Sequence, residues 1–575
     1  MMEPKMRNKF YIAIITVASI LSNAKAQSLP VGAPVLDDYY RIMQLLGKVD
    51  SNVSFAVRPI ISASTLKVND IFYPDSLTKD SNWPGAATIF FDKGRGKFQI
   101  LPLSWQQQFN SDHPYGWNDG PMIPAKGYQT MVSGGFFFKY GPLSIQFRPE
   151  YVYAANPPFN GYTSGHTGYD VSNYYVYYNL IDAPERFGNN AYSRAFWGQS
   201  SIRLTFGPMS FGLSNENVWW GPGIRNSLIL SNNAPGFEHF TINTVRPIKT
   251  IIGSFEAQIL AGRLIGTGLP PLAVTSLPDG TNLYVPKEND WRYFTGFNIN
   301  YHLKWVQGFT MGLTRTFDAY YDDIKKNGLK AYVPFFFPYA KQGTGGGLDS
   351  GTGDSFPRDQ YTSFYARYVL TKAQAEVYFE YGLNDNSYNT TDFLLSPDHS
   401  RAYIFGARKI IPIKGKNSEH ILVSGEITQM SQSPDRLVRG AGGWYQHYQV
   451  KQGQTNEGQV LGAGTGTGGN LQSMDVSWVS GFKKLGIQIE RYEHSVDFYQ
   501  NTFPDINGNS RNWVDMGFAL IGTWDYKNLL FNAKLEQIQS LNYEWILKDY
   551  NPSQYYIPHN TVSNLHAELG VTYRF

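Results

Sequence analysis

The sequence contains no cysteine. This absence excludes a disulfide framework, thiol catalysis and cysteine-ligated zinc sites. Charged residues are also scarce: they make up 17% of the chain, whereas soluble domains average about 25%. After residue 21, no apolar run reaches the roughly 20 residues that a membrane-spanning helix requires. The sequence therefore indicates neither a small disulfide-stabilised scaffold nor a helical membrane protein.

The first 26 residues have the features of a secretory signal peptide. Three basic residues within the first nine precede an apolar run over residues 10–21. An Ala-Lys-Ala triplet then supplies the small residues that a signal peptidase recognises. The sequence predicts that residues 1–26 are removed and that the mature chain, starting at Gln27, leaves the cytoplasm.

The charge balance argues against nucleic acid as a partner. The whole chain carries 49 Lys and Arg against 46 Asp and Glu. Four of the basic residues and one acidic residue lie in the predicted signal peptide, so the mature chain carries 45 of each and is formally neutral. Binding to a nucleic-acid backbone needs a basic surface. We therefore expect no nucleic acid among the partners.

Aromatic residues and glycine are abundant instead, with 40 Tyr, 37 Phe, 13 Trp and 56 Gly. Outer-membrane β-barrels have this composition, because aromatic residues gather at both membrane interfaces. Residues 565–575 show the matching strand pattern, in which apolar side chains alternate with polar ones. Such alternation describes a strand between two different solvents, although a half-buried strand of a soluble sheet shows it too.

Hairpins and long loops favour the barrel over the soluble sheet. Tight turns join four pairs of alternating strands: 128–139 with 143–154, 201–206 with 210–213, 361–370 with 374–381, and 516–524 with 529–537. Other connections are long and polar: roughly 155–195, 265–290, 320–360, 430–475, 493–512 and 541–560. Outer-membrane barrels alternate in this way, with short turns toward the periplasm and long loops outside. The sequence thus predicts an all-β fold, a transmembrane antiparallel β-barrel of the outer membrane.

A segment before the barrel is predicted to close it. Asp37 can cap a short helix whose apolar stripe includes Tyr39 and Ile42, and so short a helix must dock on another surface. The barrel's length predicts a strand count in the high teens, which encloses a lumen too wide for wall side chains to fill. The predicted organisation is a signal peptide over 1–26, an N-terminal periplasmic helix and plug-like segment over 27–127, and a barrel with long extracellular loops over 128–575.

One internal block stands out at residues 214–264. Two Trp residues precede Gly-Pro-Gly at 221–223, and Arg and Asn residues follow. Trp rings stack on the C–H faces of sugars, while Arg and Asn donate hydrogen bonds to hydroxyls. In the alternative interpretation the two Trp belong to an interface girdle and Gly-Pro-Gly is only a turn. The candidate carbohydrate-binding residues are Trp219, Trp220, Arg225, Asn226 and Arg246.

This block resembles the signature of the Wzi family, the outer-membrane proteins of capsule assembly. Three strings carry the resemblance: Trp-Trp-Gly-Pro-Gly at 219–223, Ser-Leu-Ile-Leu-Ser-Asn-Asn-Ala-Pro at 227–235, and Arg246-Pro247. Residues 110–120 also resemble Bacteroidetes-like members. The resemblance implies an 18-stranded barrel closed inside by loops, with a small periplasmic helical element. It also implies a lectin that binds capsular polysaccharide. The loops here are larger than in enterobacterial members, which leaves the glycan open.

Catalytic and cofactor signatures are missing. The sequence has no Gly-x-Ser-x-Gly elbow, the glycine-rich run at 343–347 lacks the Lys-Ser/Thr of a phosphate loop, and its Asp clusters do not match a calcium loop. We predict no enzyme, no catalytic residue, no cofactor and no metal. The favoured function is an outer-membrane lectin-like protein that binds surface (capsular) polysaccharide and organises capsule or exopolysaccharide assembly.

Two other functions remain open. One is an outer-membrane diffusion channel for sugars or small solutes, and the other is a barrel enzyme acting on lipid or glycan. The expected location is the outer membrane of a Gram-negative bacterium. Expected partners are capsular or extracellular polysaccharide, outer-membrane lipid and lipopolysaccharide, and the barrel assembly machinery, with the protein itself a monomer.

Overall fold

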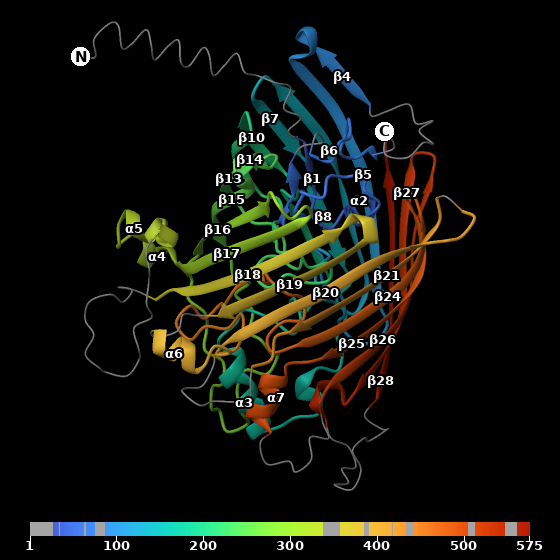
Figure 1. The fold of residues 1–575 in the computed structure, drawn as a ribbon. Helices are drawn as coiled ribbons and strands as arrows, with labels where there is room; N and C mark the ends of the chain where they lie inside the picture. Colours follow the sequence, from blue (N-terminus) through green and yellow to red (C-terminus); the bar gives the residue numbers. More distant parts are fainter. Residues whose placement is uncertain are drawn as a thin grey trace, which may run out of the picture.

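Strands of alternating apolar and polar residues form the wall of a closed antiparallel barrel in the computed structural model (Figure 1). The barrel has 18 strands, three of which are interrupted and counted here as two segments each. The structure describes residues 27–33, 35–61, 65–74, 87–336, 357–384, 390–416, 418–432, 442–503, 512–546 and 561–575. The predicted signal peptide lies outside these residues.

The wall strands follow one another around the barrel in chain order. They are β5 (Gly96–Asn110), β6 (Gly127–Tyr140), β7 (Leu143–Phe147) with β8 (Glu150–Ala154), β9 (Tyr192–Phe196) with β10 (Ser201–Phe206), β11 (Met209–Ser214), β13 (His239–Thr244) with β14 (Ile248–Lys249), β15 (Gly253–Leu264), β16 (Arg292–Leu303), β17 (Phe309–Tyr320), β18 (Asp359–Leu370), β19 (Ala375–Asn384), β20 (Arg401–Pro412), β21 (His420–Gln429), β24 (Asn470–Ser480), β25 (Lys483–Glu493), β26 (Val514–Tyr526), β27 (Leu529–Leu541) and β28 (Val562–Tyr573).

The remaining elements lie inside the wall or at its ends. The short strands are β1 (Ser28–Leu29) with β3 (Ile60–Ile61), β2 (Val57–Arg58) with β12 (Trp219–Trp220), β22 (Thr455–Asn456) with β23 (Gln459–Val460), and β4 (Thr88–Phe91) beside β5. The helices are α2 (Leu36–Leu45), α3 (Tyr169–Tyr178), α4 (Tyr321–Ile324), α5 (Leu329–Tyr332), α6 (Thr390–Leu395) and α7 (Val496–Thr502). Among the described residues, no helix is long and apolar enough to cross a lipid bilayer.

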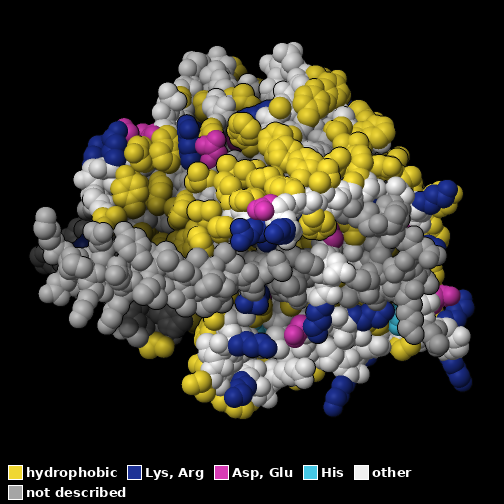
Figure 2. Space-filling model, turned by 90° about the horizontal axis from the view of Figure 1, so that it is seen from above, with side chains coloured by type: hydrophobic (Ala, Val, Ile, Leu, Met, Phe, Trp, Pro, Cys, Tyr) yellow, Lys and Arg dark blue, Asp and Glu magenta, His cyan; other side chains and the backbone are white. Residues whose placement is uncertain are grey.

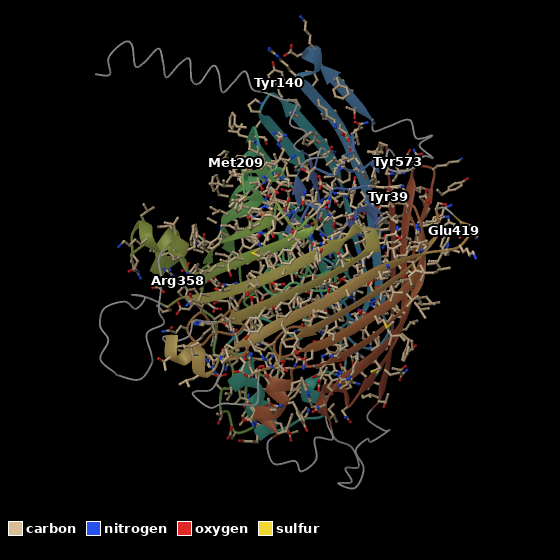
Figure 3. All side chains as sticks on the ribbon, viewed as in Figure 1. Tyr39, Tyr140, Met209, Arg358, Glu419 and Tyr573 are labelled. Atoms are coloured by element: carbon tan, nitrogen blue, oxygen red, sulfur yellow. The ribbon has the colours of Figure 1, made fainter. Side chains whose placement is uncertain are left out.

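All four predicted hairpins are present, and their turns lie at one end of the barrel, the short-turn end. Tyr140, Met209 and Tyr573 mark this end at the top of Figure 3. Viewed from there, hydrophobic side chains cover a broad area and Lys and Arg side chains project at the margin (Figure 2). Helices α3 and α7 lie at the opposite, long-loop end (Figure 1).

The barrel closes by pairing β28 with β5, for example Ala567 with Phe109. As predicted, β28 turns its apolar side chains outward: Leu569 is 47% exposed, whereas His566 is fully buried. The predicted start of the barrel at residue 128 is wrong, because the first wall strand begins at Gly96. A register shift between Leu101 and Ser104 breaks the alternation of β5 and hides it in the sequence.

Three hydrophobic clusters fill the lumen. At the short-turn end, α2 packs its Tyr39, Ile42 and Met43 against wall residues such as Leu422. The second cluster joins the loop after β11 to residues 444–463 and the wall. The third joins α3 and α7 at the long-loop end. Helix α2 is buried on both of its faces. This burial explains how so short a helix stays folded.

The predicted cap of α2 is wrong, although the helix itself is confirmed. Asp37 lies inside the first turn, and Val35 occupies the cap position without a side-chain hydrogen bond. The carboxylate of Asp37 instead pairs with the Arg58 guanidinium at 2.9 Å. A charged partner forms the stronger bond, so Asp37 joins the helix to β2 rather than capping it.

Candidate binding site

The loop between β11 and β13, residues 215–238, turns inward and crosses the lumen; we call it the inner loop. Its Gly-Pro-Gly turn is built around the carboxylate of Glu426 on β21. The backbone N–H groups of Ile224, Arg225 and Asn226 all donate to this carboxylate, over 2.7–3.1 Å. The Tyr378 hydroxyl adds a fourth bond at 2.8 Å. One wall carboxylate therefore fixes the direction of the turn.

The two glycines of the turn are required by close approach. Gly221 has a φ of +138°, and a Cβ there would lie 2.7 Å from Glu380 Oε2. A Cβ on Gly223 would lie 1.9 Å from the carbonyl oxygen of Asn226. Any other residue at either position would displace the turn, which gives the Gly-Pro-Gly string a structural reason.

The structure places three of the predicted binding residues in the core of the inner loop. Trp219 is 3% exposed and lies under the Arg58 guanidinium, 4.3 Å from its ring centre. Trp220 is fully buried and donates its indole N–H to Gln258 at 2.9 Å. Asn226 is also fully buried and donates to the Thr428 hydroxyl at 3.0 Å. These side chains hold the loop and present no face to a ligand.

The other two predicted residues lie apart from each other. Arg246 is exposed at the break between β13 and β14, toward the short-turn end. Arg225 lines a cavity of about 400 Å³ inside the barrel, the lumen cavity. Its wall is the inner side of β5 and β25–β28, and its other boundaries are the segment before α2, residues 115–122 and the inner loop. Of the five, the structure brings Arg225 alone to the lumen cavity, whereas Arg246 lines a separate pocket of about 30 Å³.

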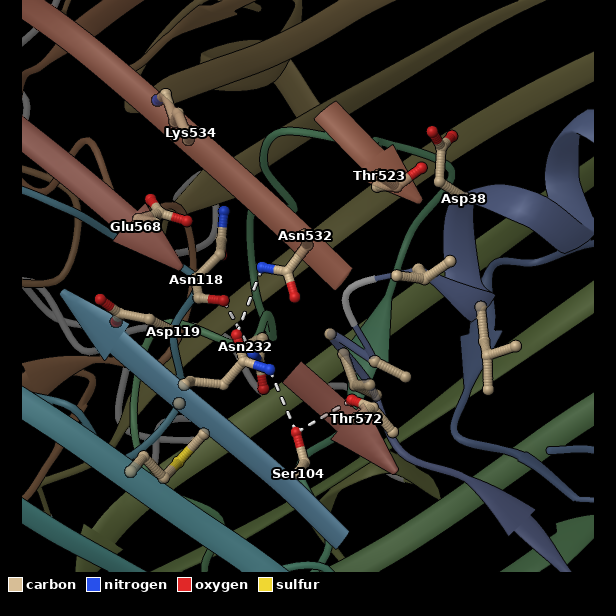
Figure 4. A pocket seen from close by; sticks show the side chains of 18 of the residues that line it. Asp38, Ser104, Asn118, Asp119, Asn232, Thr523, Asn532, Lys534, Glu568 and Thr572 are labelled. Carbon is tan, nitrogen blue, oxygen red and sulfur yellow. Dashed lines mark hydrogen bonds between the residues drawn. The ribbon is translucent and has the colours of Figure 1, made fainter. Parts of the chain in front are cut away.

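Polar side chains cover the β5–β28 side of the lumen cavity (Figure 4). The Ser104 hydroxyl lies 3.3 Å from the Thr572 hydroxyl and accepts from Gln106 at 3.1 Å. Asn532 donates in turn to Gln106 at 3.3 Å. Amide and hydroxyl groups that both donate and accept suit a ligand rich in hydroxyls.

An aromatic ring and a set of charges form the other side. Arg225 makes a two-bond ion pair with Glu490, both bonds 2.9 Å, and its guanidinium lies 5.7 Å from the Trp117 ring centre. Lys534 pairs with Glu536 at 2.7 Å and lies 3.7 Å from Glu490. The cavity therefore holds one aromatic face beside a partly neutralised charge cluster.

Several residues that line the lumen cavity, Arg148 and Arg408 among them, have a buried polar atom without a hydrogen-bond partner among the described residues. Two such atoms lie in adjacent residues of the 115–122 segment: the indole nitrogen of Trp117 and the side-chain oxygen of Asn118. Both residues line the cavity. A buried polar group without a partner costs about 1–3 kcal/mol, so a ligand that turns these side chains toward the cavity and offers one acceptor and one donor would recover that cost.

Asp119 is the titratable group of the same loop. Burial raises the pKa of its carboxyl to about 7, although the hydrogen bond from Gln108, 3.0 Å long, favours the charged form. The loop is held from the opposite side by Asn232, which donates to the Asn118 carbonyl at 2.8 Å. Around neutral pH the cavity can thus present either a carboxylate or a carboxylic acid.

Charged bonds hold α2 at the short-turn side of the lumen cavity. Asp38 lies 2.5 Å from Arg408 and 3.0 Å from Lys484. Burial opposes its charge, but these two cations outweigh burial and keep the pKa of Asp38 well below its usual value. Arg41 donates to the carbonyls of Pro222 and Gly223 at 2.9 and 3.2 Å. Helix α2 is therefore bonded to both the wall and the inner loop.

Sequence reasoning missed Trp117, Asn118 and Asp119 as site residues. They lie in the 110–120 segment, whose sequence indicates a family resemblance but no binding role. An aromatic residue between polar ones was the available signal, but nothing in the sequence shows that this loop folds back into the lumen. Among the described residues, no group of three or more His, Asp or Glu could hold a metal ion.

Comparison with known proteins gives one family. A sequence profile described as "Capsule assembly protein Wzi" matches residues 107–528. The chain is similar in structure to Wzi of Escherichia coli, described as an outer membrane protein involved in group 1 capsule assembly and a carbohydrate-binding β-barrel. The TM-score is 0.57 and the identity 12%, over 96% of this chain and 100% of that one.

Other comparisons add less. OccAB3 of Acinetobacter baumannii aligns over 83% of this chain and 98% of its own at 9% identity, with a TM-score of 0.37. That score is too low to support an argument. No curated protein sequence matches the chain. The match to the Escherichia coli structure shows the barrel fold, and the profile match extends over most of the wall.

Proposed function

Because the chain belongs to the Wzi family of capsule assembly proteins, we propose that it is a lectin-like barrel that binds surface (capsular) polysaccharide and organises capsule or exopolysaccharide assembly. The protein is an outer-membrane barrel, whose long loops face outward and whose short turns face the periplasm. The Escherichia coli relative is described as carbohydrate-binding, and the lumen cavity has the chemistry for the same ligand class.

The observation that carries the proposal is the pair of unsatisfied polar atoms beside an aromatic ring. Trp117 and Asn118 line the lumen cavity, and the indole nitrogen of the first and the side-chain oxygen of the second are buried without protein partners among the described residues. A sugar residue offers what this site lacks: hydroxyls that donate and accept, and an apolar C–H face for the ring. The cavity volume of about 400 Å³ falls in the usual range of about 300–1,000 Å³ for small-ligand pockets.

Of the residues first predicted, we retain Arg225 as a binding residue. Its side chain is 27% exposed despite the ion pair of its guanidinium with Glu490, and we infer that the guanidinium still has donors to offer. We assign Trp219, Trp220 and Asn226 to holding the inner loop that positions Arg225. Arg246 has no part in this site, because it lies outside the lumen cavity.

The filled lumen favours binding over diffusion, and we propose no enzymatic step. Hydrophobic clusters occupy the short-turn end, the middle and the long-loop end of the barrel. Two cations that line the lumen cavity, Arg225 and Lys534, are paired with the carboxylates of Glu490 and Glu536. The site is built to hold a ligand in place.

The test is binding of the purified protein to polysaccharide from the surface of its own organism. Trp117→Ala should lower the affinity at least tenfold, or about 1.4 kcal/mol, because it removes the ring and one donor. Trp305→Ala is the matched control: this Trp is 72% exposed, in the short turn between β16 and β17. Equal binding by both variants would show that the lumen cavity is not the site.

A second measurement addresses the cellular function. Deletion of the gene should lower the capsule retained on cells and raise the polysaccharide released into the medium. The Trp117→Ala protein, produced at normal levels in the outer membrane, should restore retention less well than Trp305→Ala. Unchanged retention after deletion would contradict the proposed role in capsule organisation, whatever the protein binds in vitro.

A further inference from the structure

The barrel wall has a notch at its long-loop end, beside β9. Strands β11 and β13 are only six residues each and stop at Ser214 and His239, where the chain turns into the inner loop. β10 pairs with β11, but β9 extends further and pairs only with β8 among the described strands. One edge of β9 therefore faces a gap in the wall.

An unpaired strand edge is costly in a membrane. Backbone N–H and C=O groups within the hydrocarbon region must be paired, covered, or placed against water or polar groups. The notch lies on the long-loop side, at the outer part of the wall. Whatever fills it must offer hydrogen-bonding groups to the edge of β9, and an acyl chain alone cannot do this.

The notch contains a cavity of about 540 Å³ that reaches from the outer surface of the wall to the contents of the lumen. Trp197, 63% exposed, and Arg263 line its outer part. The hairpin of β22 and β23 lines its inner part through Asn456 and Glu457. The cavity thus has an aromatic ring and a cation toward lipid and polar groups at its base.

Two arginines line the notch and differ in their bonding. Arg194 pairs with Glu457 at 2.6 Å, so its charge is already neutralised. Arg263 makes no ion pair among the described residues, and its guanidinium lies 5.5 Å from the Trp291 ring centre. Glu238 is exposed in the same notch and can accept hydroxyl hydrogen bonds. The notch therefore keeps one guanidinium available for an anion.

We propose that the notch binds the phosphorylated sugar headgroup of an outer-leaflet glycolipid. Arg263 holds the phosphate, since a guanidinium matches phosphate oxygens with paired donors. Trp197 packs on the sugar ring or on the first methylenes of the acyl chains, as Trp does at membrane interfaces. The sugar hydroxyls and amides satisfy the free edge of β9. This site is separate from the lumen cavity.

The chain offers a closely matched control for Arg263. Arg401 is the first residue of β20, also at the long-loop end, and its guanidinium lies 5.4 Å from the Tyr403 ring centre. It therefore repeats the arrangement of Arg263 over Trp291. Its strand pairs with β19 from Arg401 onward and with β21 from Tyr403 onward, and Arg401 does not line the notch.

The experiment measures lipid retained by the full-length protein in detergent, by native mass spectrometry, after addition of bisphosphorylated lipid A. The parent and Arg401→Gln should retain the lipid equally, and Arg263→Gln should retain at least tenfold less. Lipid A stripped of both phosphates should bind at least tenfold more weakly to the parent. Equal retention by Arg263→Gln, or equal binding of the stripped lipid, would overturn the proposal, as would a second copy of the chain on the notch.

Two further measurements keep the result interpretable. Heat-modifiable migration in gels identifies variants that have not formed the barrel, and Trp197→Ala then supplies an independent variant that should also lose the lipid. Polysaccharide binding by Arg263→Gln should equal that of the parent. Loss of lipid with unchanged polysaccharide binding supports the notch, whereas retained lipid refutes it without affecting the proposed lectin function.

Discussion

Glu426→Ala should release the Gly-Pro-Gly turn of the inner loop. The substitution removes the acceptor of three backbone N–H groups and of the Tyr378 hydroxyl, all inside the lumen. Each orphaned buried donor costs about 1–3 kcal/mol, which sums to about 4–12 kcal/mol for four donors. Water that enters the vacated space recovers part of this, so we expect the free energy of local opening of the turn to fall by at least about 3 kcal/mol.

Amide hydrogen exchange measures this opening directly. A fall of about 3 kcal/mol corresponds to roughly 100-fold faster exchange, expected at Ile224, Arg225 and Asn226. The wall strands should keep their protection, because their hydrogen bonds do not depend on Glu426. Glu426→Gln retains one acceptor oxygen and should give an intermediate rate.

The control is Glu419→Ala, a carboxylate just before β21 whose side-chain partners among the described residues are Lys416 and the Trp478 indole at the surface. It should leave exchange in the turn unchanged. Parental protection at residues 224–226 in Glu426→Ala would refute the reasoning and show that packing of Trp219 and Trp220, rather than the carboxylate, fixes the turn. Polysaccharide binding should weaken with Glu426→Ala, because Arg225 then loses its position.

Two further predictions concern the lumen. Burial raises the pKa of Asp119 from 3.8 to about 7, so the folded loop holds the proton more tightly than the unfolded one and its stability should fall as pH rises from about 4 to 7. Exchange at residues 115–122, corrected for intrinsic rates, should be faster at pH 8 than at pH 5, and Asp119→Asn should abolish the difference. In planar bilayers the parent should show no steady single-channel current, since α2 fills the short-turn end; Asp38→Asn, which loses charged bonds to Arg408 and Lys484, should show brief openings. A steady current from the parent would favour the diffusion channel.

The sequence was sufficient to predict the regular strands of the wall. Period-two alternation and turn lengths identified the hairpins, and β28 turns Leu569 outward and His566 inward as its pattern indicates. β5 was missed because a register shift at Leu101–Ser104 interrupts its alternation. Alternation of apolar and polar residues reflects the solvent that each face of a strand contacts. It therefore identifies a regular strand, but it does not identify a strand that a bulge interrupts.

The candidate site was less accessible to sequence reasoning. The Trp219–Asn226 string was distinctive, but its distinctiveness reflects close packing around Glu426, a residue 200 positions away from Asn226. Local sequence does not distinguish a loop that folds into the lumen from a loop that projects outside the barrel. Consequently the sequence predicts that Trp219 and Trp220 stack on sugars, whereas both are buried in the structure. Trp117 became a candidate binding residue only when the structure showed that it lines the lumen cavity.

Hydrogen bonds from Arg41 on α2 and Arg58 on β2 join these two elements to the Gly-Pro-Gly turn of the inner loop. Both guanidinium groups donate to the carbonyl of Gly223, two residues before Arg225 in the lumen cavity. A displacement of Arg225 by a ligand must therefore strain bonds that end on α2, at the periplasmic mouth. The inner loop is in this sense a mechanical connection across the outer membrane. Under the proposed function, a polysaccharide that moves Arg225 would therefore change the bonding of α2 without any solute passing through the barrel.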